Sequence, residues 1–178
     1  MPHPVLVGKA VLAAINLEKE TTFLLLTSPL QNMRIRPSRR DDGDRLVNIW
    51  RAAVDATHHF LTPEDRQAID AQVQQFLPHS PLWLAVDRQD RAVGFMGLSG
   101  SHLDALFIDP AFHDAGIGRQ LVSLALRFHP IITVDVNEQN VQAVGFYERL
   151  GFIGFGRSPT DDHGWPYPIL HMRLDPAR

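Results

Sequence analysis

A carboxylate and an imidazole stand two residues apart in an otherwise apolar segment. Asp104 interrupts the run Leu103–Ile108, where a charged side chain is unusual, and His102 directly precedes that run. Side chains two positions apart lie on the same face of a β-strand, so we expect both groups to face one site. There Asp104 is predicted to accept a proton, and His102 to relay it or to act through a water molecule. The alternative is structural, with Asp104 hydrogen-bonded at a sheet edge and His102 in a turn.

Two glycines, Gly116 and Gly118, lead into a segment with helical periodicity. Apolar residues recur there at helical spacing: Ile117, Leu121, Leu124, Ala125 and Phe128. The first N–H groups of a helix lack partners within the helix, and glycine lets a phosphate approach them closely. We therefore predict a pyrophosphate site on the backbone amides of Asp114, Ala115, Gly116, Ile117, Gly118 and Arg119, with the Arg119 side chain adding charge. An ordinary loop is the alternative, since no Gly-Lys-Ser/Thr of a Walker motif follows.

Residues 131–152, IITVDVNEQNVQAVGFYERLGF, have the pattern of a strand, a turn and a helix. The first six are rich in β-branched side chains, and the next four form a polar turn. An apolar stripe follows at helical spacing: Val141, Val144, Tyr147 and Leu150. We expect Gly151 to end the helix in a left-handed conformation, and Asn140 to cap its start or to bind a ligand. Tyr147 either packs within the stripe or presents its hydroxyl to a site.

Together these segments resemble the GNAT superfamily of acetyl-CoA-dependent N-acetyltransferases. The loop HDAGIG is similar to the family motif Q/R-x-x-G-x-G/A, although His113 stands where the family usually has Gln or Arg. The spacing of Asn140 and Tyr147, followed by Leu-Gly-Phe, is similar to the last strand and helix of the family. The resemblance covers residues 33–174 and is strongest to the small bacterial YjaB-like acetyltransferases. The stretches that carry it are VDATHHFL, PLWLAV, HLDALFIDP, VDVNEQN, QAVGFYERLGF and PYPIL.

The resemblance implies acetyl-CoA as the co-substrate and a place for each of its parts. The amides of the glycine loop would bind the pyrophosphate. Backbone groups of Leu106, Phe107 and Ile108 would face the pantetheine arm as an added strand does, and Asn140 would hydrogen-bond the same arm. Tyr147 would lie near the thioester sulfur and act as the general acid.

Acetyl transfer to a primary amine requires proton movement at both substrates. An alkylamine has a pKa of about 10.4, so roughly one molecule in a thousand is neutral at about pH 7.4. A base must remove the ammonium proton and an acid must protonate the departing thiolate, which are the roles predicted for Asp104 and Tyr147. The chain contains no cysteine, which favours direct transfer over a cysteine-bound intermediate. The alternatives are a catalytically silent acyl-CoA-binding or sensing module and a generic nucleotide binder.

Composition limits the remaining partners. The 178 residues suit one domain, and the net charge of −3 gives no basic footprint for nucleic acid. No apolar run approaches membrane-spanning length, so we expect a cytoplasmic protein without a membrane partner. The adjacent His58 and His59 do not share a helical face, so we expect no metal site, and Thr57–Leu61 is instead expected to line the acceptor entrance. The acceptor amine, on a small molecule or a peptide, stays open, as does the choice between monomer and homodimer.

The order of these elements indicates an α+β fold: a GNAT-like mixed, mostly antiparallel central sheet of about six to seven strands, with about four helices on both faces. Strands are expected at 33–36, 82–86, 92–98, 103–108, 131–136, 152–157 and 169–174. Asp41 or Asp42 is expected to cap the first helix, and Thr62, followed by Pro63, the second. Residues 1–32, with a short helix at 8–17 and an apolar segment at 22–26, are interpreted as an extension outside a domain formed by residues 33–178.

Overall fold

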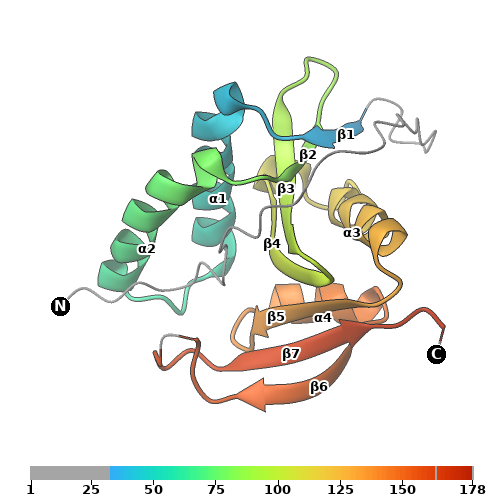
Figure 1. Cartoon of the computed structure of the whole chain (residues 1–178). Coiled ribbons are helices and arrows are strands. Elements are labelled where there is room, and N and C mark those ends of the chain that lie inside the picture. Colours follow the sequence, from blue (N-terminus) through green and yellow to red (C-terminus); the bar gives the residue numbers. More distant parts are fainter. Residues whose placement is uncertain (1–32, 163, 178) are drawn as a thin grey trace.

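The computed structural model describes residues 33–162 and 164–177, and the helix expected at 8–17 and the apolar segment at 22–26 lie outside them. Within the described residues the strands form one seven-stranded sheet in the order β1-β2-β3-β4-β5-β7-β6 (Figure 1). The strands are β1 (Arg34–Pro37), β2 (Trp83–Val86), β3 (Ala92–Ser99), β4 (His102–Ile108), β5 (Ile132–Asn137), β6 (Ile153–Ser158) and β7 (Ile169–Leu174). The helices are α1 (Gly43–Thr57), α2 (Pro63–Phe76), α3 (Ile117–Phe128) and α4 (Val141–Arg149). The predicted α+β class is confirmed.

Neighbouring strands pair antiparallel except β4 and β5, which run parallel. In the described part of the chain this parallel pairing is short, because it joins only His102 with Thr133 and Leu103 with Val134. Beyond these pairs β4 continues to Ile108 and β5 to Asn137. The sheet therefore opens between β4 and β5.

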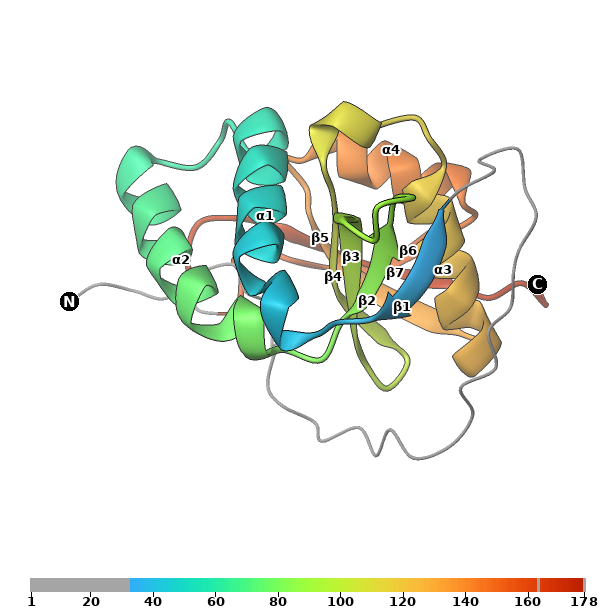
Figure 2. The same ribbon diagram turned by 90° about the horizontal axis from the view of Figure 1, so that it is seen from above.

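The helices cover both faces of the sheet, and each face has its own core. α1 and α2 lie on one face, while α3 and α4 lie on the other (Figures 1 and 2). Ile49 and Leu84 are fully buried in the first core, and Leu121 and Ile132 in the second. Val141 departs from the predicted apolar stripe, because it is 77% exposed at the start of α4, ahead of the turn that packs on the sheet. Among residues 33–162 and 164–177, no helix is long and apolar enough to cross a membrane.

The two predicted helix caps had different outcomes. Thr62 caps α2, since its Oγ1 accepts a hydrogen bond from the N–H of Asp65 at 3.1 Å, and Pro63 follows in the first turn as predicted. Asp42 precedes α1 but does not cap it. Its carboxylate accepts hydrogen bonds of 2.8 and 2.9 Å from the guanidinium of Arg36, which lowers the pKa of Asp42. The Asp42 carboxylate therefore forms a buried ion pair with Arg36 and does not cap α1 as the local sequence pattern predicted. Leaving either charge of such a pair buried without its partner would be costly.

Candidate active site

A cavity of about 640 Å³ occupies the opening between β4 and β5. Its walls come from both faces of the sheet. Trp50 and Val73 contribute from α1 and α2, and Ala143 and Tyr147 contribute from α4. A cavity walled from both faces has to pass through the sheet, and the separation of β4 from β5 after two residue pairs allows this. Two substrates that approach from opposite faces can therefore meet inside it.

The structure places about half of the predicted site residues on this cavity. Those that line it are His102, Asp104, Leu106, Phe107, Asn140 and Tyr147. Ile108 and the loop 114–119 are not part of its lining. Ile108 ends β4, and the turn η3 (Pro110–Phe112) connects that strand directly to the loop. The predicted pyrophosphate site thus continues the strand that forms one wall of the cavity.

The loop before α3 has the geometry of a helix start with amides that can bind an anion. Asp114 and Gly116 have left-handed φ values of 64° and 73°, a conformation that glycine and, less often, aspartate adopt. No side chain caps α3, and its first hydrogen bond runs from the N–H of Gln120 to the carbonyl of Gly116 at 3.1 Å. The N–H groups of Ile117–Arg119 precede that bond, and the Arg119 side chain is exposed. Together with the dipole of α3, these amides fit a diphosphate.

Packing between α3 and α4 explains why residue 118 has no side chain. Gly118 is buried, and a Cβ built on it would lie 2.8 Å from Cζ of Phe146. We expect Gly118→Ala to lower the free energy of unfolding by about 1–3 kcal/mol, as overpacked cores do, and urea denaturation measures this. Adding Phe146→Leu should recover most of the loss because the shorter side chain leaves room. A double variant no more stable than Gly118→Ala would contradict this explanation.

Two polar residues of the α4 region reach the cavity. Asn140 both caps α4 and lines the cavity, since its Oδ1 accepts a hydrogen bond from the N–H of Ala143 at 3.1 Å. The cap uses Oδ1, which leaves the Nδ2 amide as a donor for a ligand. Tyr147 is 6% exposed and packs edge-on against Phe146 and Phe152. Burial raises the pKa of Tyr147, so its hydroxyl stays protonated at neutral pH.

Asp104 and His102 both line the cavity but bind different partners. The pairing of β3 with β4 shifts register at residues 97–98, which leaves Asp104 at a β-bulge. Its carboxylate accepts a hydrogen bond from Ser99 Oγ, and burial raises the pKa of Asp104. His102 turns to β5 instead, where its Nδ1 lies 2.9 Å from Oγ1 of Thr133. No direct hydrogen bond joins His102 to Asp104, so a proton relay between them, or a route through a water molecule, stays a prediction.

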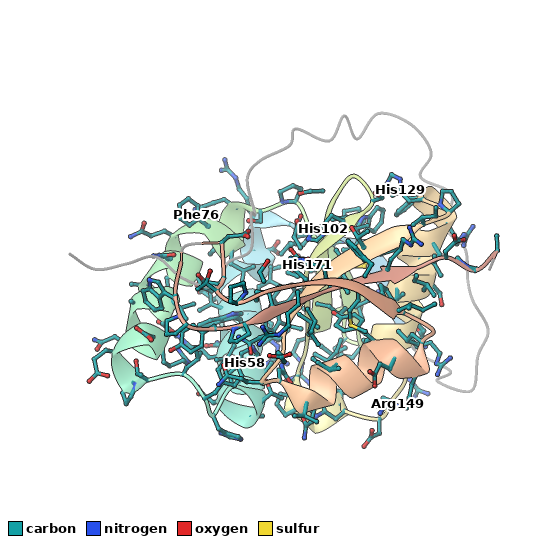
Figure 3. All side chains as sticks on the ribbon, turned by 90° about the horizontal axis from the view of Figure 1, so that it is seen from below. His58, Phe76, His102, His129, Arg149 and His171 are labelled. Carbon is teal, nitrogen blue, oxygen red and sulfur yellow. The ribbon has the colours of Figure 1, made fainter. Side chains whose placement is uncertain are left out.

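A hydrogen-bonded chain across β5, β7 and β6 was missed by the sequence analysis. Asp135 lines the cavity, and its Oδ1 lies 2.6 Å from Nδ1 of His171, its direct partner across the two strands. Nε2 of His171 lies 2.7 Å from Oγ of Ser158, and Nε2 of His102 lies 4.0 Å from Oδ2 of Asp135. Figure 3 labels the two imidazoles, His102 and His171. Asp135 and His171 are 36 residues apart in the sequence, so no local pattern marks the pair. The chain leads from the cavity to a partly exposed imidazole.

Negative charge dominates the cavity lining. Four carboxylates contribute to it: Asp104, Asp135, Asp161 and Asp162. Within the described part of the chain, no lysine or arginine lines this cavity. His58, from the segment predicted at the acceptor entrance, also lines it, whereas Phe60 and Leu61 pack against the core under α1 and α2. In the same residues no group of three or more His, Cys, Asp or Glu is placed to hold a metal ion.

Residues 52–175 match a protein family described as Acetyltransferase (GNAT) domain, which covers more than half of the chain. This chain belongs to the GNAT acetyltransferase family. The family assignment predicted from the glycine loop and from Tyr147 is thereby confirmed. So is the predicted enzyme class, N-acetyltransferase.

Named GNAT proteins are similar to this chain over most of its length. It is 54% identical over 138 residues to the peptidyl-lysine N-acetyltransferase YjaB of Escherichia coli, which covers 78% of this chain and 94% of that protein. The solution structure of the apo form of YjaB from Escherichia coli has a TM-score of 0.77 and 53% identity, covering 79% of this chain and 96% of that one. The structure of yncA from Salmonella typhimurium with its cofactor acetyl-CoA, at 18% identity and a TM-score of 0.55 over 81% of this chain and 94% of that one, supports the GNAT fold alone.

Proposed function

We propose that this chain transfers the acetyl group of acetyl-CoA directly to the ε-amine of a lysine in a peptide or protein. The observation that carries the proposal is the cavity that passes through the sheet. Tyr147, Asn140 and the carboxylates of Asp104 and Asp135 line this one cavity. The unit proposed to carry the activity is residues 33–178.

Acetyl-CoA is proposed to bind along β4 toward α3. The amides of residues 114–119 would hold the diphosphate, for the reasons of geometry given above. Beyond Leu103, β4 no longer pairs with β5, so backbone groups of Leu106, Phe107 and Ile108 can pair with the pantetheine arm. Nδ2 of Asn140 supplies a further donor. In this arrangement the thioester of acetyl-CoA would lie in the cavity.

The amine has to lose a proton before it can attack the thioester, and Asp104 is proposed to take it. Burial raises the pKa of Asp104, which makes its carboxylate a stronger base than an exposed one. Acetylation of an ammonium group releases one net proton for each acetyl group transferred. Asp104 must therefore lose its proton again in every turnover. His102, which also lines the cavity, and the Asp135–His171 pair beside it are proposed to carry the proton away.

The thiolate of CoA has to gain a proton when the C–S bond breaks, and Tyr147 is proposed to donate it. The raised pKa of Tyr147 keeps its hydroxyl protonated until that step. The hydroxyl forms no hydrogen bond to another described residue, so it is available to the sulfur. The nitrogen of the tetrahedral adduct still carries a second proton of the original ammonium group, and the loss of that proton, directly or through water, restores the hydroxyl of Tyr147.

Two observations support a lysine acceptor. The acidic lining of the cavity attracts an ammonium group and disfavours an anionic acceptor. The relative of 54% identity is named a peptidyl-lysine N-acetyltransferase. A lysine side chain is long and unbranched, so it can reach a through-sheet cavity from the α1–α2 side while the peptide stays outside.

The test is acetyl transfer to a lysine peptide and to the same peptide with norleucine in place of lysine. We expect release of CoA and the mass of one acetyl group on the lysine peptide, and neither on the control. Small amines assayed in parallel decide between a peptide and a small-molecule acceptor. Tight CoA binding without transfer to any amine would instead support the silent acyl-CoA-binding module.

A further inference from the structure

His58 follows the last residue of α1 and lines the cavity at that end of the helix. Its backbone N–H bonds the carbonyl of Val54 at 2.8 Å and closes the last turn of α1. Its ring packs against Phe60, with ring centroids 5.3 Å apart, and lines the same cavity as Asp104 and Tyr147. Figure 3 labels it beside the sheet, apart from His102 and His171.

The hydrogen bonds of Thr57 decide which nitrogen of His58 carries the proton. The Thr57 hydroxyl donates its one hydrogen to the carbonyl of Ala53, at 2.7 Å. The contact of 2.8 Å between Thr57 Oγ1 and Nδ1 of His58 therefore requires Nδ1–H as the donor. In a neutral imidazole Nε2 is then an unprotonated acceptor, and it has no hydrogen-bond partner among the described residues.

The ring is held in this neutral form. Burial, and to a smaller extent the positive charges of Arg66 and His59, lower the pKa of His58 to about 4. At neutral pH the unprotonated Nε2 of His58 is therefore a hydrogen-bond acceptor in an acidic cavity. No described residue donates a hydrogen bond to it.

We infer that Nε2 of His58 accepts a hydrogen bond from the ammonium group of the acceptor and so positions it for transfer. The inference rests on the proposed function and names the contact by which that site selects a protonated primary amine. The carboxylates of the cavity attract the ammonium group from a distance, and the hydrogen bond to Nε2 of His58 fixes its orientation. With a pKa of about 4, His58 does not itself take the proton, so it is a positioning residue and Asp104 remains the proposed base.

The experiment compares His58→Leu, which removes the acceptor atom, with His58→Gln, whose Oε1 can take the place of Nε2. We expect His58→Leu to raise KM for the amine about ten-fold, the loss of one hydrogen bond to a charged group, while the KM for acetyl-CoA stays unchanged. His58→Gln should recover most of the loss. His79→Leu is the matched control, because His79 is exposed and does not line the cavity.

A second readout separates positioning from a structural role. Nitrogen-15 NMR of the wild-type protein should show the Nδ1–H form of His58 from about pH 6 to 8, without a titration near its ordinary pKa. The charged groups around the ring are Arg66 and His59 beside it and the carboxylates of the same cavity, Asp104, Asp135, Asp161 and Asp162. An Nε2–H form, or equal KM values for His58→Leu and His58→Gln, would overturn the inference. A wild-type protein that acetylates no amine would overturn the proposed function instead. The NMR measurement would still report the tautomer of His58, because it does not depend on activity.

Discussion

Tyr147→Phe is expected to lower kcat for acetyl transfer about 10²-fold while the affinity for CoA changes less than about two-fold. A positioned general acid contributes on this order, and the variant removes nothing else. The phenyl ring fills the same space against Phe146 and Phe152, and the hydroxyl bonds no other described residue. Single-turnover kinetics with a lysine peptide, beside calorimetric titration of CoA, measure both quantities.

The structural interpretation of Tyr147 predicts a different pattern. If the hydroxyl served packing alone, Tyr147→Phe would keep its kcat. The melting temperature of Tyr147→Phe is expected to match that of the wild-type protein, which shows that the fold is retained. Phe152→Leu is the control for a change in the same aromatic cluster, and it should lower stability while kcat stays within about three-fold. A kcat of Tyr147→Phe close to that of the wild type would refute the role of general acid.

Asp104→Asn is expected to lower kcat/KM for the amine on the order of 10²-fold and to remove the acid limb of its pH profile. The sign follows from the pKa: Asp104 acts as a base when deprotonated, so activity falls as the pH falls through its pKa. Because burial raises that pKa, the acid limb lies above the range of an exposed aspartate. Initial rates at subsaturating peptide over a range of pH measure this.

Ser99 provides the matched variant for Asp104. Its hydroxyl donates a hydrogen bond to the Asp104 carboxylate, and this bond lowers the pKa of Asp104. Ser99→Ala should therefore shift the acid limb to higher pH while keeping kcat/KM near the wild-type value on the alkaline side. If the acid limb persists in Asp104→Asn, another group is the base, and Asp135 is then the next to test because it lines the same cavity.

Local chemistry accounts for the parts of the protein that the sequence predicted well. The turn before α3 follows from Gly116, whose positive φ favours glycine, and from the apolar periodicity after it. The start of α2 follows from Thr62 and Pro63, and the end of α4 from Gly151, which has a φ of 95°. Each of these signals lies within one helical turn, so no distant residue has to be known.

The sequence by itself determined the class of the fold, the glycine loop and the presence of Asp104 and Tyr147 near one site. The tertiary structure decided which groups meet there. The bulge at Asp104, the turn of His102 toward Thr133 and the pairing of Asp135 with His171 all depend on strand register. Register is set by packing between segments far apart in the chain, and a shift of one residue moves every side chain to the other face. The physical origin of the cavity is likewise non-local, because it opens where β4 and β5 cease to pair.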